Sequence, residues 1–227
     1  HIDEKEKSLF HVTPETGWMN DPNGFSVYQG KVHLFYQFYP YKTEWGPMHW
    51  GHQVTEDLVK WEAYPVAMAP DQDYDHIGCF SGSAVEADGK HVLFYTGVSK
   101  KDGKEIQNQC IAIGDGKTYE KWQDNPVIKG DIMPEKFDRK DFRDPKIWKK
   151  DGRYYCVVGN RYEENCGQIV LFSSEDYKNW RYEKVLLRND GKNGDMLECP
   201  DYLEVDGYPV IICSPQNMHA QKYEFHN

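Results

Sequence analysis

The stretch Ser83-Ala-Val-Glu-Ala-Asp-Gly89-Lys-His-Val-Leu-Phe-Tyr95 carries the pattern that decides the fold. A short strand is followed by a glycine-centred turn and a strongly apolar strand. Asp-Gly between two such runs predicts a β-hairpin, because glycine tolerates the positive φ of tight hairpin turns. The pattern recurs at intervals of roughly 60 residues, which indicates an internal repeat. Its other copies are Gly24-Phe-Ser-Val-Tyr-Gln-Gly30-Lys-Val-His-Leu-Phe-Tyr36, Lys146-Ile-Trp-Lys-Lys-Asp-Gly152-Arg-Tyr-Tyr-Cys-Val-Val158 and Tyr202-Leu-Glu-Val-Asp-Gly207-Tyr-Pro-Val-Ile-Ile212.

A second marker, a polar turn that ends in tryptophan, keeps the same period. A β-like run precedes each of these turns, and we expect a further short outer strand after each tryptophan. Each unit then holds about four strands, which is the size of a β-propeller blade. We interpret the recurring tryptophans as packing residues. They are Trp61, Trp122 and Trp180, and the expected outer strands cover residues 64–66, 125–128 and 184–187.

The repeat predicts an all-β fold built from propeller blades, rather than one large or two small domains. Propellers close with about four to eight blades, so we expect these 227 residues to be part of a longer ring, with an exposed sheet edge. The expected blades cover about 15–70, about 75–130 and about 135–190, and a fourth begins over about 195–227.

Composition agrees with this fold and argues against two kinds of partner. Aromatic residues make up 15% of the chain, and 19 glycines and 12 prolines supply turn residues. The 37 acidic residues outnumber the 27 basic ones, giving a net charge of −10, whereas nucleic-acid binding needs a basic face. No apolar run approaches the roughly 20 residues that span a bilayer. We therefore expect neither nucleic acid nor a membrane as partner.

The cysteines and histidines give no sign of a metal site. None of the six cysteines forms a Cys-x-x-Cys pair, and Cys110, Cys156 and Cys213 lie within apolar runs, as buried thiols do. We expect free thiols in a reducing compartment, the cytoplasm; secretion stays open if a leader was removed. His49 and His52 have a spacing that points their rings to opposite faces of a strand, so we expect no metal there.

Carboxylates recur just before three of the four hairpin turns. Asp21, Asp144 and Glu198 lie eight or nine residues before a turn glycine, and a proline follows each within two residues. The first strand of a propeller blade lines the central channel, so these acids, placed at the strand starts, should surround one pocket. Proline fixes the chain direction there. Clustered carboxylates suit glycoside hydrolysis, and their repulsion should raise the pKa of one of them.

Five motifs in the chain together resemble glycoside hydrolase family 32, which includes invertases, fructanases and sucrose-6-phosphate hydrolases. The resemblance implies a five-bladed β-propeller followed by a β-sandwich. This chain would cover about the first three and a half blades and lack the sandwich. The motifs are Trp18-Met-Asn-Asp-Pro-Asn-Gly24, Trp50-Gly-His52, Phe80-Ser-Gly-Ser83, Phe142-Arg-Asp-Pro145 and Glu198-Cys-Pro-Asp201.

By this resemblance Asp21 is the nucleophile, Glu198 the general acid/base, and Asp144 the transition-state stabiliser that binds the fructosyl 3- and 4-hydroxyls. The implied reaction is a retaining double displacement that releases terminal β-D-fructofuranosyl units from sucrose, sucrose 6-phosphate or fructans. It needs no metal or organic cofactor. A non-catalytic carbohydrate-binding propeller and a fructosyltransferase remain alternatives, and the preferred fructoside and oligomeric state stay open. The implied substrate contacts are Asn20, Gln37, Trp45, Phe80, Ser81 and Arg143.

Overall fold

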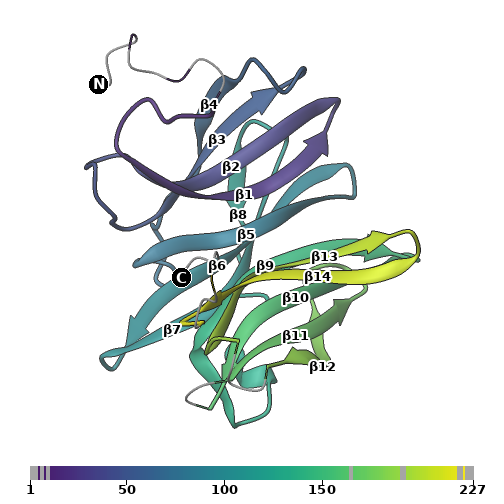
Figure 1. Cartoon of the computed structure of the whole chain (residues 1–227). Coiled ribbons are helices and arrows are strands. Elements are labelled where there is room, and N and C mark those ends of the chain that lie inside the picture. Colours follow the sequence, from purple (N-terminus) through teal and green to yellow (C-terminus); the bar gives the residue numbers. More distant parts are fainter. Residues whose placement is uncertain are drawn as a thin grey trace.

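The computed structural model describes residues 11–163, 166–189 and 193–218, together with Lys5, Ser8 and Lys222. In this part of the chain the strands form four antiparallel sheets (Figure 1). Three of the sheets have four strands each, hydrogen-bonded in sequence order, and the last is a two-stranded hairpin. The predicted all-β fold is therefore confirmed, and we refer to the three complete sheets as blades 1 to 3.

The strands follow the repeat seen in the sequence. Blade 1 holds β1 (Trp18–Tyr28), β2 (Lys31–Tyr39), β3 (His49–Thr55) and β4 (Glu62–Met68). Blade 2 holds β5 (Gly78–Ala87), β6 (Lys90–Lys101), β7 (Lys104–Gly114) and β8 (Tyr119–Lys121). A 3-10 turn, Gly130–Ile132, leads to blade 3, with β9 (Phe137–Lys150), β10 (Arg153–Tyr162), β11 (Cys166–Ser174) and β12 (Trp180–Arg188). The final hairpin pairs β13 (Met196–Val205) with β14 (Tyr208–Gln216).

The first strand of each sheet lies on the inside of the assembly. β1 packs against β5, β5 against β9, and β9 against β13, so segments far apart in sequence run side by side (Figure 1). This stacking of four-stranded sheets around their first strands is consistent with a β-propeller. It places the inner strands, where the candidate acids lie, next to one another.

All four predicted hairpin turns are present. In each, the two central residues both have positive φ, as a two-residue turn of the primed type requires. In the turn between β5 and β6, for example, φ is 53° at Asp88 and 69° at Gly89. The other turns are centred on Gln29-Gly30, Asp151-Gly152 and Asp206-Gly207.

The outer strand expected at residues 125–128 in blade 2 is wrong. The outer strand is β8, which precedes Trp122, and Ile128 makes only an isolated bridge to Gln109. The Asn125 side chain explains the difference. Its Oδ1 accepts from the Ile111 N–H at 2.9 Å and its Nδ2 donates to the Ile111 C=O at 2.8 Å, so an amide side chain satisfies the groups a strand would have paired.

The main core lies between blades 2 and 3. It includes fully buried Phe94, Ile111, Phe142 and Phe172. Trp180 is buried in it and packs edge-on against Phe94 with ring centroids 5.4 Å apart, and half-buried Trp122 packs on the same core. These two tryptophans therefore have the packing role predicted for them. Trp61, in the corresponding turn of blade 1, is half-buried.

The side chains considered as thiols or metal ligands have ordinary surroundings. All six cysteines are free, and Cys79, Cys110 and Cys156 are buried. His49 Nδ1 lies 2.9 Å from the Pro47 C=O, whereas His52 contacts His33. In the described ranges no three His, Cys, Asp or Glu side chains are grouped as metal ligands would be. No helix in that part of the chain has the length and apolar character needed to span a bilayer.

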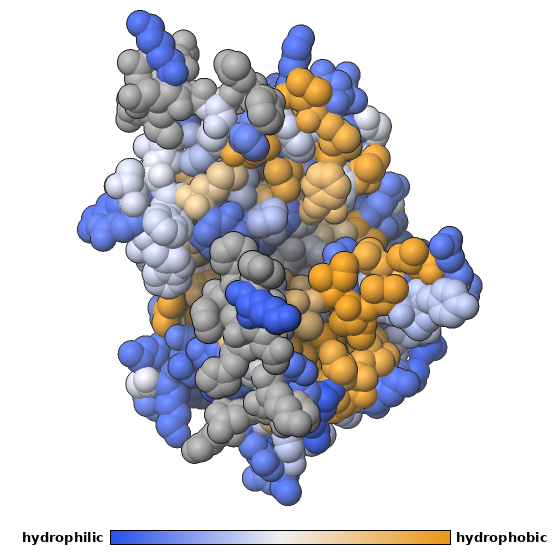
Figure 2. All heavy atoms as spheres, viewed as in Figure 1, coloured by the Kyte–Doolittle hydropathy of each residue, from blue (hydrophilic) through white to orange (hydrophobic). Residues whose placement is uncertain are grey.

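Apolar side chains are exposed on the inner strands at both ends of the assembly. Figure 2 shows a continuous apolar area over β13 and β14, where Leu203, Val205 and Ile212 are exposed. On β1, at the other end, Phe25 and Val27 are exposed as well. Contiguous apolar surface of this kind usually marks a face that packs against another element.

Candidate active site

A β-bulge interrupts each inner strand at a corresponding position. In every case the inner strand carries one more residue than the strand it pairs with, which re-aims the side chains at the bulge. In β9 the bulge gives Asp144 a φ of 65°, and in β13 it gives Cys199 a φ of 47°. The direction in which the candidate side chains point is therefore set by the repeated bulge and not by the start of the strand alone. The bulges contain Asn20-Asp21 in β1, Ser81 in β5, Asp144-Pro145 in β9 and Cys199-Pro200 in β13.

Asp144 is not at the start of its strand, as the sequence spacing had suggested. β9 begins at Phe137, which pairs with Tyr162, so Asp144 lies in the middle of a 14-residue strand. The extension exists because residues 137–143 continue to pair with β10. Asp21 and Glu198 do lie near the starts of β1 and β13.

A cavity of about 240 Å³ lies between the inner strands, at or beside the bulges. Four short segments line it: 22–25, 81–83, 144–146 and 199–201. Of the three acids expected around one pocket, Asp144 lines this cavity, whereas exposed Asp21 and partly exposed Glu198 each directly precede a lining segment. A larger open hollow of about 980 Å³ lies between the β6–β7 turn and the start of β9, but exposed charges of both signs line it without converging.

Asp144 is the buried acid of the group, with 6% of its surface exposed. Its Oδ2 accepts from the Cys199 N–H at 2.9 Å, and its own N–H donates to Thr96 Oγ1 at 3.0 Å. Burial raises the pKa of Asp144 to about 6, against the lowering effect of Arg143; the charges of Glu198 and Asp21 add to the rise. One of the three acids therefore has a raised pKa, as expected, but it is Asp144 rather than the residue identified as the general acid/base, and burial contributes more than repulsion.

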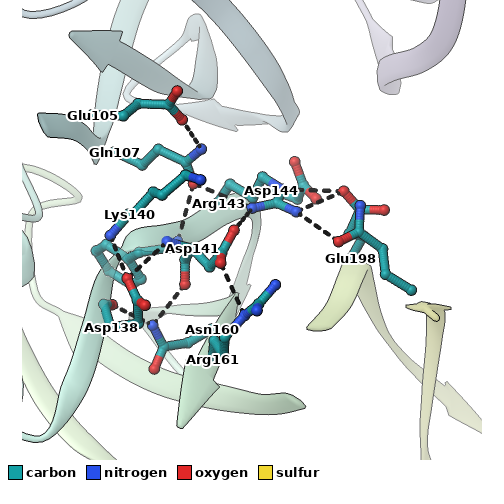
Figure 3. Close-up of polar contacts among 12 residues, drawn as sticks. Glu105, Gln107, Asp138, Lys140, Asp141, Arg143, Asp144, Asn160, Arg161 and Glu198 are labelled. Carbon is teal, nitrogen blue, oxygen red and sulfur yellow. Dashed lines mark hydrogen bonds and ion pairs between the residues drawn. The ribbon is translucent and has the colours of Figure 1, made fainter. Parts of the chain in front are cut away.

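Arg143 binds Glu198 through two nitrogens (Figure 3). Nη2 donates to Glu198 Oε1 at 2.8 Å and Nε to the same oxygen at 3.1 Å. Among the described residues no hydrogen bond reaches Glu198 Oε2. Burial alone would lower the pKa of Arg143, but Asp144, Asp141 and Glu198 outweigh it and raise that pKa, so the guanidinium stays charged. The arrangement ties one carboxylate oxygen to a fixed cation.

Three buried polar residues of blade 2 hold the segment that carries Arg143 and Asp144. Gln107 Oε1 accepts from the Phe142 N–H at 3.0 Å, and Gln109 Nε2 donates to the Phe142 C=O at 2.8 Å. Thr96, which accepts from the Asp144 N–H, donates to Gln109 Oε1 at 2.7 Å. These residues were not predicted from the sequence. Their signal was polar side chains at every second position, Gln107 and Gln109, just before the apolar run of residues 110–113.

On the opposite side, Asp21 contacts blade 2 through Ser81, whose hydroxyl lies 3.4 Å from Asp21 Oδ2. With the Asn23 amide turned so that its nitrogen faces Ser81, Asn23 donates to Ser81 Oγ at 3.2 Å and accepts from Gln37 Nε2 at 2.9 Å. Gln37 is 3% exposed and also donates to the Cys79 C=O at 3.0 Å. Gln37 therefore supports Ser81 through Asn23, and Ser81 contacts Asp21 in the β1 bulge. Buried Asn23 was not singled out by sequence.

The remaining candidate substrate contacts are Trp45, Phe80 and Asn20. Trp45 is 54% exposed and packs edge-on against half-buried Phe80, with ring centroids 6.1 Å apart. Trp50 is in the core, where its Nε1 donates to the Phe80 C=O at 3.1 Å. Exposed Asn20 accepts from Trp18 Nε1 at 2.8 Å. Trp45 thus offers an open aromatic face, whereas Trp50 does not.

The combination of inner-strand acids, bulges and four-stranded sheets agrees with one family. The sequence profile of the glycosyl hydrolases family 32 N-terminal domain matches residues 11–227. The chain belongs to glycosyl hydrolase family 32. A sucrose-6-phosphate hydrolase of Zymomonas mobilis is 42% identical over 96% of this chain and 44% of its own length. A levanase of Bacillus subtilis is 39% identical over 92% of this chain and 31% of its own length.

Solved structures of family 32 share the fold. A β-fructofuranosidase of Bombyx mori, determined as a mutant in complex with sucrose, has a TM-score of 0.86 at 42% identity. That match covers 94% of this chain and 45% of the Bombyx mori chain. Fructan 1-exohydrolase IIa of Cichorium intybus, determined in complex with 1-kestose, has a TM-score of 0.77 at 34% identity, over 88% of this chain and 38% of that one. The chain spans less than half the length of these relatives.

Proposed function

We propose that the protein to which this chain belongs is a β-fructofuranosidase that works by a retaining double displacement. The observation that carries the proposal is the meeting of three carboxylates from three separate sheets at one set of bulges. Asp21 and Glu198 lie close enough to Asp144 for their charges to act on its ionisation. Three acids with distinct surroundings allow a division of roles, as glycoside hydrolysis requires.

The surroundings suggest which acid does what. Exposed Asp21, held by Ser81, would attack C2 of the fructosyl group, and Glu198 would protonate the leaving oxygen while Arg143 fixes its orientation. Water deprotonated by Glu198 would then release fructose. Buried Asp144, oriented by the Cys199 N–H, would bind the fructosyl hydroxyls. The exposed ring of Trp45 offers a face for sugar C–H groups.

The proposed substrates are sucrose, sucrose 6-phosphate and fructans. The names of the relatives support this range, since they include a sucrose-6-phosphate hydrolase and a levanase, and solved relatives were determined with sucrose and 1-kestose. We also propose that the propeller has five blades and that a β-sandwich follows it outside this chain. The exposed apolar residues of β1 and of β13–β14 support further blades, because they would be covered when the ring closes.

The decisive test replaces the proposed nucleophile in the full-length protein. Asp21→Ala should reduce fructose release by about 10³-fold or more, because it removes the carboxylate proposed to form the covalent intermediate. Fructose is measured with sucrose, sucrose 6-phosphate, inulin and levan as substrates. Glu204→Gln is the matched control, since this exposed acid lies on the inner strand β13 but pairs with Lys150.

Three results would count against the proposal. Near-wild-type turnover by Asp21→Ala would remove this residue from the nucleophile role. Binding of fructosides by the wild type without any product would indicate a carbohydrate-binding propeller. Fructosyl oligosaccharides, rather than free fructose, as the main product at high sucrose would indicate a transferase.

A further inference from the structure

Asp141 lies between two arginines, one of which holds the proposed acid/base residue. Its Oδ1 accepts from Arg143 Nη1 at 2.7 Å, and its Oδ2 lies 2.9 Å from Arg161 Nε. Only 13% of the Asp141 side chain and 9% of the Arg143 side chain are exposed, so solvent screens the pair weakly. Figure 3 shows the sequence of contacts from Arg161 through Asp141 and Arg143 to Glu198. Asp141 acts on Glu198 through Arg143.

The backbone of Asp141 is fixed independently of Arg143. Its N–H donates to Asp138 Oδ1 at 3.2 Å, and its C=O accepts from Asn160 Nδ2 at 2.8 Å. Asn160 is fully buried in β10, and its Oδ1 accepts from Gln168 Nε2 in β11 at 2.7 Å. Gln168 in turn accepts from Arg188 Nε in β12 at 2.9 Å. Side chains from all four strands of blade 3 thus hold the backbone that carries the Asp141 carboxylate.

A fixed second anion matters because the charge of Glu198 must change during the reaction. When Glu198 carries the proton, its attraction for the guanidinium is weaker, and a long arginine side chain has many rotamers available. A second carboxylate, held against Nη1 and outside the proton-transfer steps, keeps Arg143 in the same place in both protonation states of Glu198. Gln107 Oε1 and Gln216 Oε1, each 3.4 Å from a guanidinium nitrogen, are neutral and more distant acceptors.

We propose that Asp141 is a positioning residue that anchors Arg143 against Glu198 through both proton-transfer steps. This inference rests on the proposed function. The charged and titratable groups facing Glu198 are Asp21 from β1, Arg143 and Asp144 from β9, and the Cys199 thiol from β13. Behind Arg143 stand Asp141 and then Arg161, whose Nη1 lies 3.4 Å from Asp195 Oδ2. Asp141 and Arg161 therefore add charges of opposite sign behind the same arginine.

The displacement of Arg143 gives a test that a merely structural role would not pass. In the full-length protein, Asp141→Asn should lower kcat about tenfold at the wild-type optimum while KM changes less than about threefold, because Arg143 loses its fixed position. Asp141→Glu keeps a carboxylate beside Nη1 and should recover most of the lost kcat.

Glu175→Gln is the matched control. It breaks the Arg153–Glu175 ion pair of the same blade, in which Glu175 is exposed, and should leave kcat and KM unchanged. Thermal unfolding of each variant identifies any loss of folding. If wild type releases fructose but Asp141→Asn keeps the wild-type kcat, or Asp141→Glu recovers none of a lost kcat, the positioning role is overturned while the proposed function stands. If wild type releases no fructose from any fructoside, the proposed function itself fails.

Discussion

Two buried polar clusters join neighbouring sheets, and they differ in charge. The first, which we call the site cluster, consists of Asp141, Arg143, Asp144 and Glu198 and joins blade 3 to the β13–β14 hairpin. The second, the histidine cluster, consists of His33, His52 and His91 and joins blade 1 to blade 2. The site cluster is built from a cation and several anions, whereas the histidine cluster is neutral. Burial in the site cluster serves chemistry, whereas burial in the histidine cluster serves packing.

The histidine cluster is held by hydrogen bonds and stacked rings. His33 Nδ1 lies 3.0 Å from His52 Nε2, and His91 bonds to Ser26 Oγ at 2.9 Å and to the Tyr119 hydroxyl at 2.7 Å. The Phe35 ring stacks on His52 at 4.1 Å. Burial lowers the pKa of His52 and of His91 to about 3, so both rings are neutral at pH 7. Neutral rings avoid the cost of burying charge between the blades.

Removing the cation of the site cluster should have the largest effect. Arg143→Leu leaves Asp141, Asp144 and Glu198 close together without their positive partner. We expect the free energy of unfolding to fall by about 3–5 kcal/mol, because breaking a buried pair leaves uncompensated charge. Fructose release should fall by about 10²-fold or more. Urea unfolding and kcat/KM of the full-length variant measure the two effects.

Arg153→Leu breaks the Arg153–Glu175 pair on the same blade, where the partner is exposed, and should cost less than about 1 kcal/mol. Equal losses for the two arginine variants would mean that the site cluster gains nothing from its charged pair.

Acid should break the histidine cluster. The folded-state pKa values of His52 and His91, about 3, lie below the ordinary value of 6.5, so the unfolded chain binds more protons between those limits. Their contribution to stability is therefore complete above pH 6.5 and is lost as the pH falls toward 3. Between pH 7 and pH 5 the loss is roughly 2 kcal/mol for each ring.

A variant lacking one ring isolates this acid effect. His91→Gln can still bond to Ser26 and Tyr119, and its free energy of unfolding should fall less steeply between pH 7 and pH 5 than that of the wild type. Urea unfolding at each pH measures the slope. His76→Gln, at an exposed position, is the control and should keep the wild-type slope. If His91→Gln also keeps that slope, the His91 ring is not the acid-sensitive group.

The sequence predicts the features of both clusters that depend on neighbouring residues. Asp-Gly turns need positive φ at adjacent positions, so the hairpins and the order of strands follow from local chemistry. The motifs also point to Asp21, Asp144 and Glu198, because a proline follows each within two residues at a repeated position. Backbone conformation that depends on neighbouring residues can therefore be predicted from short stretches of sequence.

Features that depend on contacts between strands escape prediction from sequence. The bulges at Asp144 and Cys199 exist because the inner strand carries one more residue than its partner there. Nothing in either strand alone reveals this register. The link from Asp141 to Asn160 joins residues of two strands and is visible only once the strands are paired. The expected strand at 125–128 failed for the same reason, since the Asn125 side chain bonds to distant Ile111.

The last expected effect concerns Asp144, whose pKa burial raises. Because the folded-state pKa of Asp144 is about 6, above the ordinary 3.8, the folded protein binds more protons between these values. Its contribution to stability is therefore most favourable below about pH 3.8 and worsens as the pH rises through 6, by about 3 kcal/mol in all. This pH dependence is opposite in sign to that of the histidine cluster over the same range. The stability of the wild type therefore shows only the difference between the two contributions.

Asp144→Asn should separate the two contributions. The amide has the same shape, can still accept from the Cys199 N–H, and carries no charge to bury. By urea unfolding, the variant should be more stable than the wild type at pH 7.5, equal to it near pH 4, and steeper in its loss of stability toward acid. Asp206→Asn, in the exposed β13–β14 turn, is the control and should follow the wild type. A variant less stable than the wild type at pH 7.5 would show that Arg143 more than compensates the buried charge. A more stable variant that no longer releases fructose would show that the site keeps an unfavourable carboxylate for its chemistry.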